Sequence, residues 1–125
     1  MTNQIQNPKT KSFNLEERTA RFGQDFIEFA KKIPENTINR PLISQGVRSS
    51  TSIGANYMEA DAAESKQDFN HKISISKKEA KETMHWARMI AVANPELVNE
   101  CRKLWQEAHE LCLIFSAILK KKKTK

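Results

Sequence analysis

Three observations predict an all-α protein, an antiparallel up-down four-helix bundle. Apolar residues recur every three or four positions in four separate stretches, which is the period of an amphipathic helix. No stretch alternates apolar and polar residues between turn signals, as a strand would. All three glycines lie at or before residue 54, and the four prolines fall near the edges of the periodic stretches.

Length and composition favour one globular domain. The chain has 125 residues, of which 38% are hydrophobic and 29% are charged, as is typical of a single folded domain. No apolar run approaches the roughly 18 residues that cross a bilayer, and the first 13 residues lack the apolar segment of a secretory signal. The two cysteines do not make a disulfide framework. We therefore expect a cytoplasmic protein with no membrane partner.

The first helix is expected to begin after Asn14. Glu17, three positions later, completes a pattern typical of a helix N-terminus. Pro34 is expected to stop the helix, because proline cannot continue the hydrogen-bond ladder. The apolar stripe of this helix consists of Leu15, Phe22, Phe26, Phe29 and Ile33.

The second helix is expected to begin at Pro41, a residue suited to a first helical turn, with Asn39 as a candidate cap. Its core face is rich in small residues, which would let a neighbouring helix approach closely. That face consists of Ile43, Gly46, Val47, Ser50, Ile53, Gly54 and Tyr57.

The third and fourth helices follow after short connections. Ser65 with Asp68 marks the start of the third helix, and Asn94-Pro95 is typical of a cap and first-turn proline for the fourth. Short connections make sequence neighbours antiparallel. We expect a bundle over residues 13–120, between a disordered tail over residues 1–12 and a basic tail over residues 121–125.

Positive charge is concentrated at the ends of the chain. Of the net charge of +6, residues 1–14 carry +2 and the last six residues carry +5, which leaves −1 for residues 15–119. The domain is therefore nearly neutral. Basic tails attract nucleic acid without sequence preference, although a solvated terminus, or lysines that stabilise a helix C-terminus, explains them equally well.

The third helix carries a second stripe on a side away from its core stripe. Five residues recur there at spacings of 4, 3, 4 and 3: Ile75, Glu79, Glu82, Trp86 and Met89. A helix that is apolar on a second side needs a second partner, and Leu113 and Ile114 likewise leave the core face of the fourth helix. We predict that these seven residues form a homo-oligomer interface. The alternative is that Trp86 packs against a loop or the N-terminal tail of its own chain.

Basic residues indicate a second kind of partner. The candidate contacts to nucleic-acid phosphates are Lys72, Lys77, Lys81, Arg88, Lys120, Lys121, Lys122 and Lys123. Glu79 and Glu82 lie on the same helix, so this strip alone does not decide the matter. A polar series on the second helix indicates either hydrogen bonds between helices or a polar groove that faces a partner. The series consists of Gln45, Ser49, Ser52 and Asn56.

Neither a catalytic site nor a metal site is indicated. Glu82 and His85 have the Glu-x-x-His spacing of di-metal bundles, but Gln106 stands three residues before His109, so the second pair is missing. Cys101 and Cys112 are expected to be buried apolar fillers. No glycine-rich phosphate-binding pattern occurs in the sequence. We therefore expect a non-enzymatic protein with no cofactor and no small-molecule substrate.

Three segments resemble a known bacterial family. They are residues 48–60 (RSSTSIGANYMEA), 65–69 (SKQDF) and 77–86 (KKEAKETMHW). With residues 94–115, they are similar to the four-helix-bundle proteins encoded by intervening sequences of large-subunit ribosomal RNA genes, and the resemblance covers residues 22–119. The positions that match the family signature, which we interpret first as structural, are Ser52, Asn56, Glu59, Glu79 and Glu82.

The resemblance implies a homopentamer packed around a central axis, without an established activity. It also implies a relationship to the accessory proteins of diversity-generating retroelements, which are pentamers that bind nucleic acid and a reverse transcriptase. The near-neutral body of this chain argues against a strongly basic pore. We therefore expect a non-enzymatic, oligomeric assembly or adaptor module. The alternative is an RNA- or DNA-binding accessory protein that uses the basic tail and the strip on the third helix.

Overall fold

The computed structural model describes residues 14–123, with side chains as far as Lys121. It contains α2 (Leu15–Ala30), α3 (Asn39–Asp61), α4 (Lys66–Ala93), a 3-10 turn η1 (Pro95–Leu97) and α5 (Val98–Lys123). No strand occurs in this part of the chain, so the all-α prediction is confirmed. The expected tail over residues 1–12 lies outside the described residues.

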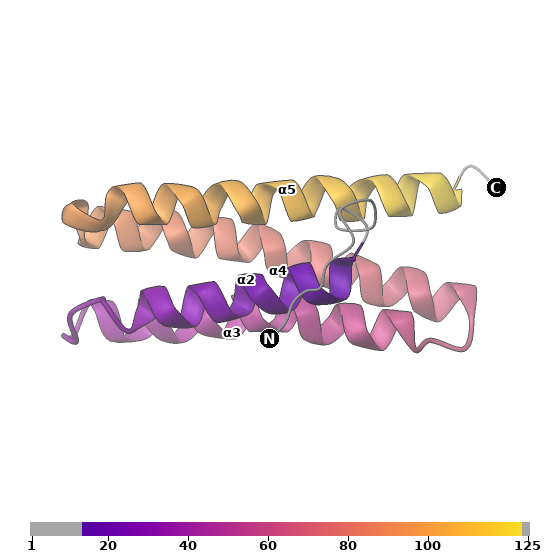
Figure 1. The fold of residues 1–125 in the computed structure, drawn as a ribbon, viewed down its shortest axis with the longest axis horizontal. Coiled ribbons are helices and arrows are strands. Elements are labelled where there is room, and N and C mark those ends of the chain that lie inside the picture. Colours follow the sequence, from indigo (N-terminus) through magenta and orange to yellow (C-terminus); the bar gives the residue numbers. More distant parts are fainter. Residues whose placement is uncertain (1–13, 124–125) are drawn as a thin grey trace.

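The four helices run alternately up and down, with α2 and α3 on one side of the bundle and α4 and α5 on the other (Figure 1). Helices that follow each other in sequence pack together, and α2 also contacts α5. The α2–α3 and α4–α5 connections lie at one end of the bundle, and the α3–α4 connection lies at the other.

Local sequence signals set two helix starts as predicted. The Asn14 side chain accepts a hydrogen bond from the Glu17 backbone at 3.1 Å, and Ser65 Oγ accepts one from the Asp68 backbone at 3.0 Å. These bonds satisfy amides that have no partner inside the helix. The first helix ends at Ala30, four residues before Pro34.

Three helix boundaries differ from the prediction. The second predicted helix, α3, begins at Asn39 and not at Pro41, because the Asn36 side chain accepts a hydrogen bond from the Asn39 backbone at 2.7 Å. At the other connection, η1 separates Asn94 from α5. The last helix continues to Lys123, so residues 121–123 of the expected tail are helical. Lysine favours this, because it has good helix propensity and suits the negative end of the helix dipole.

A buried pair of asparagines joins the two connections at one end of the bundle. Asn39 donates to Asn94 Oδ1 at 3.0 Å, and Asn94 donates back to Asn39 Oδ1 at 2.9 Å. Each amide also donates to a backbone carbonyl, that of Pro34 for Asn39 and that of Ile90 for Asn94. Asn39 is the first residue of α3 and not its cap, so that prediction is wrong, whereas Asn94 occupies the predicted cap position before Pro95 without a side-chain capping bond. Their amides tie the two connections together.

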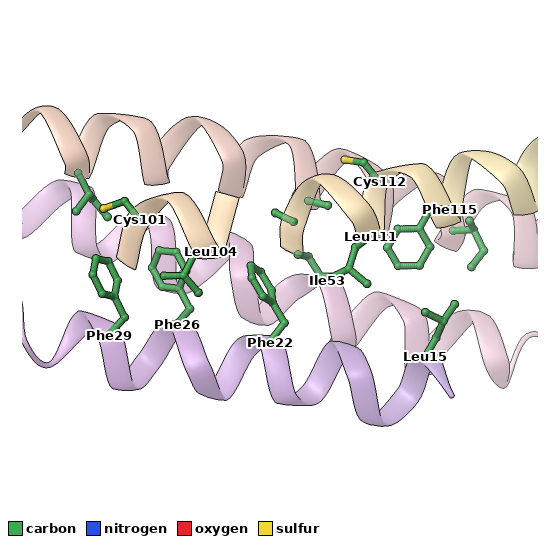
Figure 2. Close-up of a cluster of buried hydrophobic side chains, with 14 of the residues drawn as sticks. Leu15, Phe22, Phe26, Phe29, Ile53, Cys101, Leu104, Leu111, Cys112 and Phe115 are labelled. Carbon is green, nitrogen blue, oxygen red and sulfur yellow. The ribbon is translucent and has the colours of Figure 1, made fainter. Parts of the chain in front are cut away.

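The core lies between the two pairs of helices. Phe22, Phe26 and Phe29 point from α2 toward α5, where Leu104 and Leu111 face them (Figure 2). Arg18 of α2 pairs with Glu107 (2.7 Å) and Glu110 (3.0 Å) of α5 at the surface, and Lys32, just after the end of α2, pairs with Glu100 of α5 (2.6 Å). The bundle therefore closes between α2 and α5 through large side chains and ion pairs.

Candidate interaction faces

Two surface faces of the bundle collect most of the side chains that the sequence singled out, together with several that it did not. The α3/α4 face consists of Gln45, Arg48, Ser52, Asn56 and Glu59 from α3 and of Ile75, Glu79, Glu82, Trp86 and Met89 from α4. The α4/α5 face consists of Asn70, Ser74, Lys77, Lys81 and Arg88 from α4 and of Trp105, His109, Ser116 and Lys120 from α5. They lie on opposite flanks of α4.

An arginine of α3 holds the α3/α4 face together. Arg48 donates to Glu79 at 3.1 Å and also to Glu82, both one helix away on α4. It donates as well to Gln45 at 3.0 Å on its own helix. The hydrogen bond to Glu82, followed by the one to Glu79, raises the pKa of Arg48, so the guanidinium stays charged.

Glu79 lies deeper than the sequence predicts. It was expected on an outward stripe, but only 8% of it is exposed. Burial of a carboxylate is costly without a partner, and the Arg48 guanidinium provides that partner. The Glu79 side chain therefore packs between α3 and α4 and does not project into solvent.

The polar series on α3 divides between two roles. Ser49 is buried and shares a hydrogen bond of 2.8 Å with Thr83 of α4, so it links the two helices. Ser52 and Asn56 bond to backbone carbonyls of their own helix, at 2.7 and 2.9 Å. The surface next to Arg48 is therefore polar, and neither side chain bonds across to α4.

The apolar part of the α3/α4 face is half-buried. Ile75, Trp86 and Met89 are each partly exposed. The Trp86 ring packs edge-on to His85, with 4.9 Å between ring centroids. Its Nε1 is buried and has no hydrogen-bond partner among the described residues, although a buried indole N–H usually has one.

The two apolar residues that the sequence adds from the fourth helix do not join this face. Leu113 is 56% exposed on α5, and Ile114 packs against the hydrophobic core. The prediction that Ile114 leaves the core face is therefore wrong. Because α5 packs against both α4 and α2, more of its circumference is covered than a single apolar stripe would predict.

The α4/α5 face follows the seam between these two helices. The thiol of Cys112 on α5 donates to the backbone carbonyl of Lys77 on α4 at 3.6 Å. Trp105 and His109 stand about two turns and one turn before Cys112 on the same side of α5, and their rings stack at 5.2 Å with 22° between planes. The sequence patterns did not single out this stack. The signal that could have found it is the spacing of four residues from Trp105 to His109 and of three from His109 to Cys112, which places all three on one side of a helix.

No carboxylate lies on this seam, because the acidic residues of both helices point to other neighbours. On α4, Glu79 and Glu82 pair with Arg48 of α3, and Asp68 lies near Lys72. Two of the three carboxylates of α5 pair with Arg18 of α2, and the third pairs with Lys32, just after the end of α2. The glutamates that seemed to offset the basic strip therefore lie on the other side of α4.

One residue of the predicted basic strip is misplaced. The Lys72 amine pairs with Glu59 of α3 at 2.6 Å, and this hydrogen bond raises the pKa of Lys72. It therefore belongs to the α3/α4 side. Lys77, Lys81, Arg88 and Lys120 form no ion pair with any other residue in the part of the chain described, whereas the side chains of Lys122 and Lys123 lie outside that part.

A groove crosses the seam near the start of α4 and the end of α5. Its volume is about 550 Å³. The lining residues are Gln67, Asn70, His71, Ser74, Lys77, Ser116, Leu119 and Lys120. The Asn70 Oδ1 atom is buried and has no hydrogen-bond donor among the described residues. The groove thus combines two cations with an acceptor that lacks a donor.

Both cysteines, Cys101 and Cys112, are free thiols buried in the bundle. Burial raises the pKa of the Cys101 thiol to about 11, and burial also raises the pKa of Cys112, despite the nearby Lys81 and Lys77. No group of three or more metal-ligating side chains occurs within residues 14–121.

Among the helices described here, none has both the length and the apolar character to cross a membrane.

Comparison with known proteins places the chain in a family. The model of the 23S rRNA-intervening sequence protein family matches residues 11–117. A crystal structure of a protein of unknown function from the S23 ribosomal protein family of Bacteroides thetaiotaomicron VPI-5482 has the same fold. It is 27% identical with a TM-score of 0.74, and the match covers 84% of this chain and 97% of that chain. A search of curated proteins gives no match. The chain therefore belongs to the 23S rRNA-intervening sequence protein family.

Proposed function

We propose that this protein is a non-enzymatic assembly module that forms a homo-oligomer through the α3/α4 face. One observation carries the proposal. Trp86, Ile75 and Met89 remain partly exposed around an ion-pair network that is complete within one chain. Aromatic residues and methionine at such a position are typical of interface cores, and the Trp86 N–H has no acceptor among residues 14–121.

The charge of this face favours a second copy over a charged partner. Arg48 and Lys72 face Glu59, Glu79 and Glu82, so the face carries a net charge of −1 and every cation is paired. Two identical faces of high charge would repel each other. A nearly neutral face can be buried against the surface of a second copy without that cost.

Light scattering coupled to size-exclusion chromatography tests the proposal. The wild type is expected to elute as an oligomer, at about 72 kDa for the five chains of 14.4 kDa that the family resemblance implies. Trp86→Glu places a charge in the interface and is expected to reduce the mass toward one chain. Met89→Glu serves as a second variant if Trp86→Glu does not fold.

Val92→Glu is the matched control, because Val92 is 76% exposed on α4 and lies about 120° around the helix from Trp86. Its mass should equal that of the wild type. A wild-type mass of one chain would contradict the proposal. So would an unchanged mass for well-folded Trp86→Glu and Met89→Glu.

A second candidate function is nucleic-acid binding by the α4/α5 face. The specific observation is the segregation of charge, since Lys77, Lys81 and Arg88 lie on a seam from which the carboxylates of both helices are turned away. Unpaired cations in a row attract a phosphate backbone. Nucleic acid that copurifies with the wild type and is released by salt supports this function. Binding that does not depend on salt would contradict it.

A further inference from the structure

We infer that the groove between α4 and α5 binds a ribonucleotide unit of single-stranded RNA. In this arrangement Lys77 and Lys120 hold the phosphate, and the ribose 2′-hydroxyl bonds to Asn70. The inference rests on the second candidate function, nucleic-acid binding by the α4/α5 face, and names its ligand and its contact site.

The groove requires a negatively charged ligand. Lys77 and Lys120 line it from two different helices, and none of its eight lining residues is acidic. Neither lysine is engaged in an ion pair within the described chain. His71, Ser74 and Ser116 add further hydrogen-bond donors to the lining. Charged and neutral donors that converge from two sides are typical of phosphate sites.

Asn70 narrows the choice of ligand. The residue lines the groove, its Oδ1 atom is buried without a donor among the described residues, and a buried acceptor of this kind is costly. The ligand should therefore bring a hydrogen-bonding hydroxyl next to its phosphate. The 2′-hydroxyl of RNA meets this need as both donor and acceptor, so it fits either orientation of the carboxamide. The deoxyribose of DNA has no such group.

The surface beyond the groove favours a chain over a free nucleotide. Lys81 and Arg88 continue the row of cations, about 6 and 16 Å beyond Lys77 along the helix axis. The stacked Trp105 and His109 rings lie on the facing side of α5 and are partly exposed. Aromatic rings beside a row of cations are typical of single-strand binding, where bases stack and phosphates pair.

Fluorescence anisotropy with labelled oligouridine and oligodeoxyuridine, each of about 12 nucleotides, tests the inference on the full chain. The wild type should bind the RNA roughly fivefold more tightly, the ratio expected for about one additional net hydrogen bond. Asn70→Ala should remove this preference and leave the DNA affinity unchanged. Thermal unfolding of each variant shows whether its fold is intact.

The lysines are tested through the salt dependence of binding. Lys77→Gln combined with Lys120→Gln should weaken both oligonucleotides and reduce the slope of log affinity against log salt by about 1.4, since each lost phosphate contact contributes about 0.7 for a single strand. Lys31→Gln is the matched control, because exposed Lys31 pairs with Glu28 outside both faces. It should leave affinity and slope unchanged.

The outcomes separate this inference from the function on which it rests. If RNA and DNA bind equally well, or if Asn70→Ala keeps the preference, the ribose contact is wrong. If Lys81→Gln and Arg88→Gln weaken binding while the Lys77 and Lys120 variants do not, the groove is wrong and nucleic-acid binding by this face stands. If uridine monophosphate binds as tightly as the oligonucleotide, a chain is not the ligand. If neither oligonucleotide binds, both proposals fail.

Discussion

At the scale of single residues, the buried asparagine pair shows how side chains far apart in sequence fix one end of the bundle. Asn39 and Asn94 are 1% and 4% exposed, and each amide bonds both to the other and to a backbone carbonyl. Sequence reasoning placed both at helix ends, but a local pattern cannot show that two helix ends meet in space. Their pairing follows from the antiparallel packing of the whole bundle.

Asn94→Ala is therefore expected to lower the free energy of unfolding by about 1–3 kcal/mol, because it leaves the buried Asn39 oxygen without a donor. Urea denaturation followed by circular dichroism measures the change. Asn99→Ala is the matched control, since exposed Asn99 only accepts a bond from Arg102. A difference below about 0.5 kcal/mol between the two variants would contradict the role of the pair.

The two thiols yield a prediction about reactivity. With a pKa raised from 9.0 to about 11, Cys101 carries roughly 100-fold less thiolate at pH 8 than an ordinary cysteine, and thiolate is the reactive form. Folded protein should react slowly with a disulfide reagent, more quickly as the pH rises toward 11, and much more quickly in urea. Rapid labelling of Cys101 in folded protein at pH 8 would show that the site is open.

At the scale of elements, the small residues of α3 set how closely its neighbours approach. A Cβ atom built on Gly46 would lie 2.6 Å from Phe26 Cζ, whereas one on Gly23 of α2 would meet Thr51 at an ordinary 3.5 Å. The sequence predicted close approach from this small-residue face. It could not show which glycine is required, because the answer depends on where the Phe26 ring lies.

Matched alanine substitutions at the two glycines should have opposite signs. Gly23→Ala is expected to stabilise the protein by about 0.5–1 kcal/mol through helix propensity. At Gly46 the same gain is outweighed by overpacking against Phe26, which costs about 1–3 kcal/mol, so Gly46→Ala should destabilise. Chemical denaturation of both variants compares them directly. Equal shifts in the same direction would contradict the packing described here.

Helix periodicity therefore predicted the elements well and the faces only in part. The period of 3.6 residues is local, so the core stripes and the capping residues Asn14 and Ser65 could be found from sequence. The partners of charged residues are not local. Lys72 and Glu79 were both assigned to outward surfaces, yet each forms a contact between α3 and α4.

At the scale of the whole molecule, the two flanks of α4 differ in charge. One flank is nearly neutral and carries Trp86, whereas the other carries cations without carboxylates. A neutral face suits contact with an identical chain, and a cationic seam suits a polyanion. An oligomer would repeat the cationic seam on every subunit, so that weak contacts to one RNA chain add through avidity.

If the two faces of α4 act independently, one measurement separates them: light-scattering mass with absorbance at 260 and 280 nm, recorded in the presence of RNA. The Lys77→Gln, Lys120→Gln double variant should keep the oligomer mass and lose the RNA. Trp86→Glu should fall toward 14.4 kDa and still bind RNA, though more weakly because avidity is lost. A double variant that dissociates into single chains, or a folded Trp86→Glu that remains oligomeric, would contradict the assignment of the two faces.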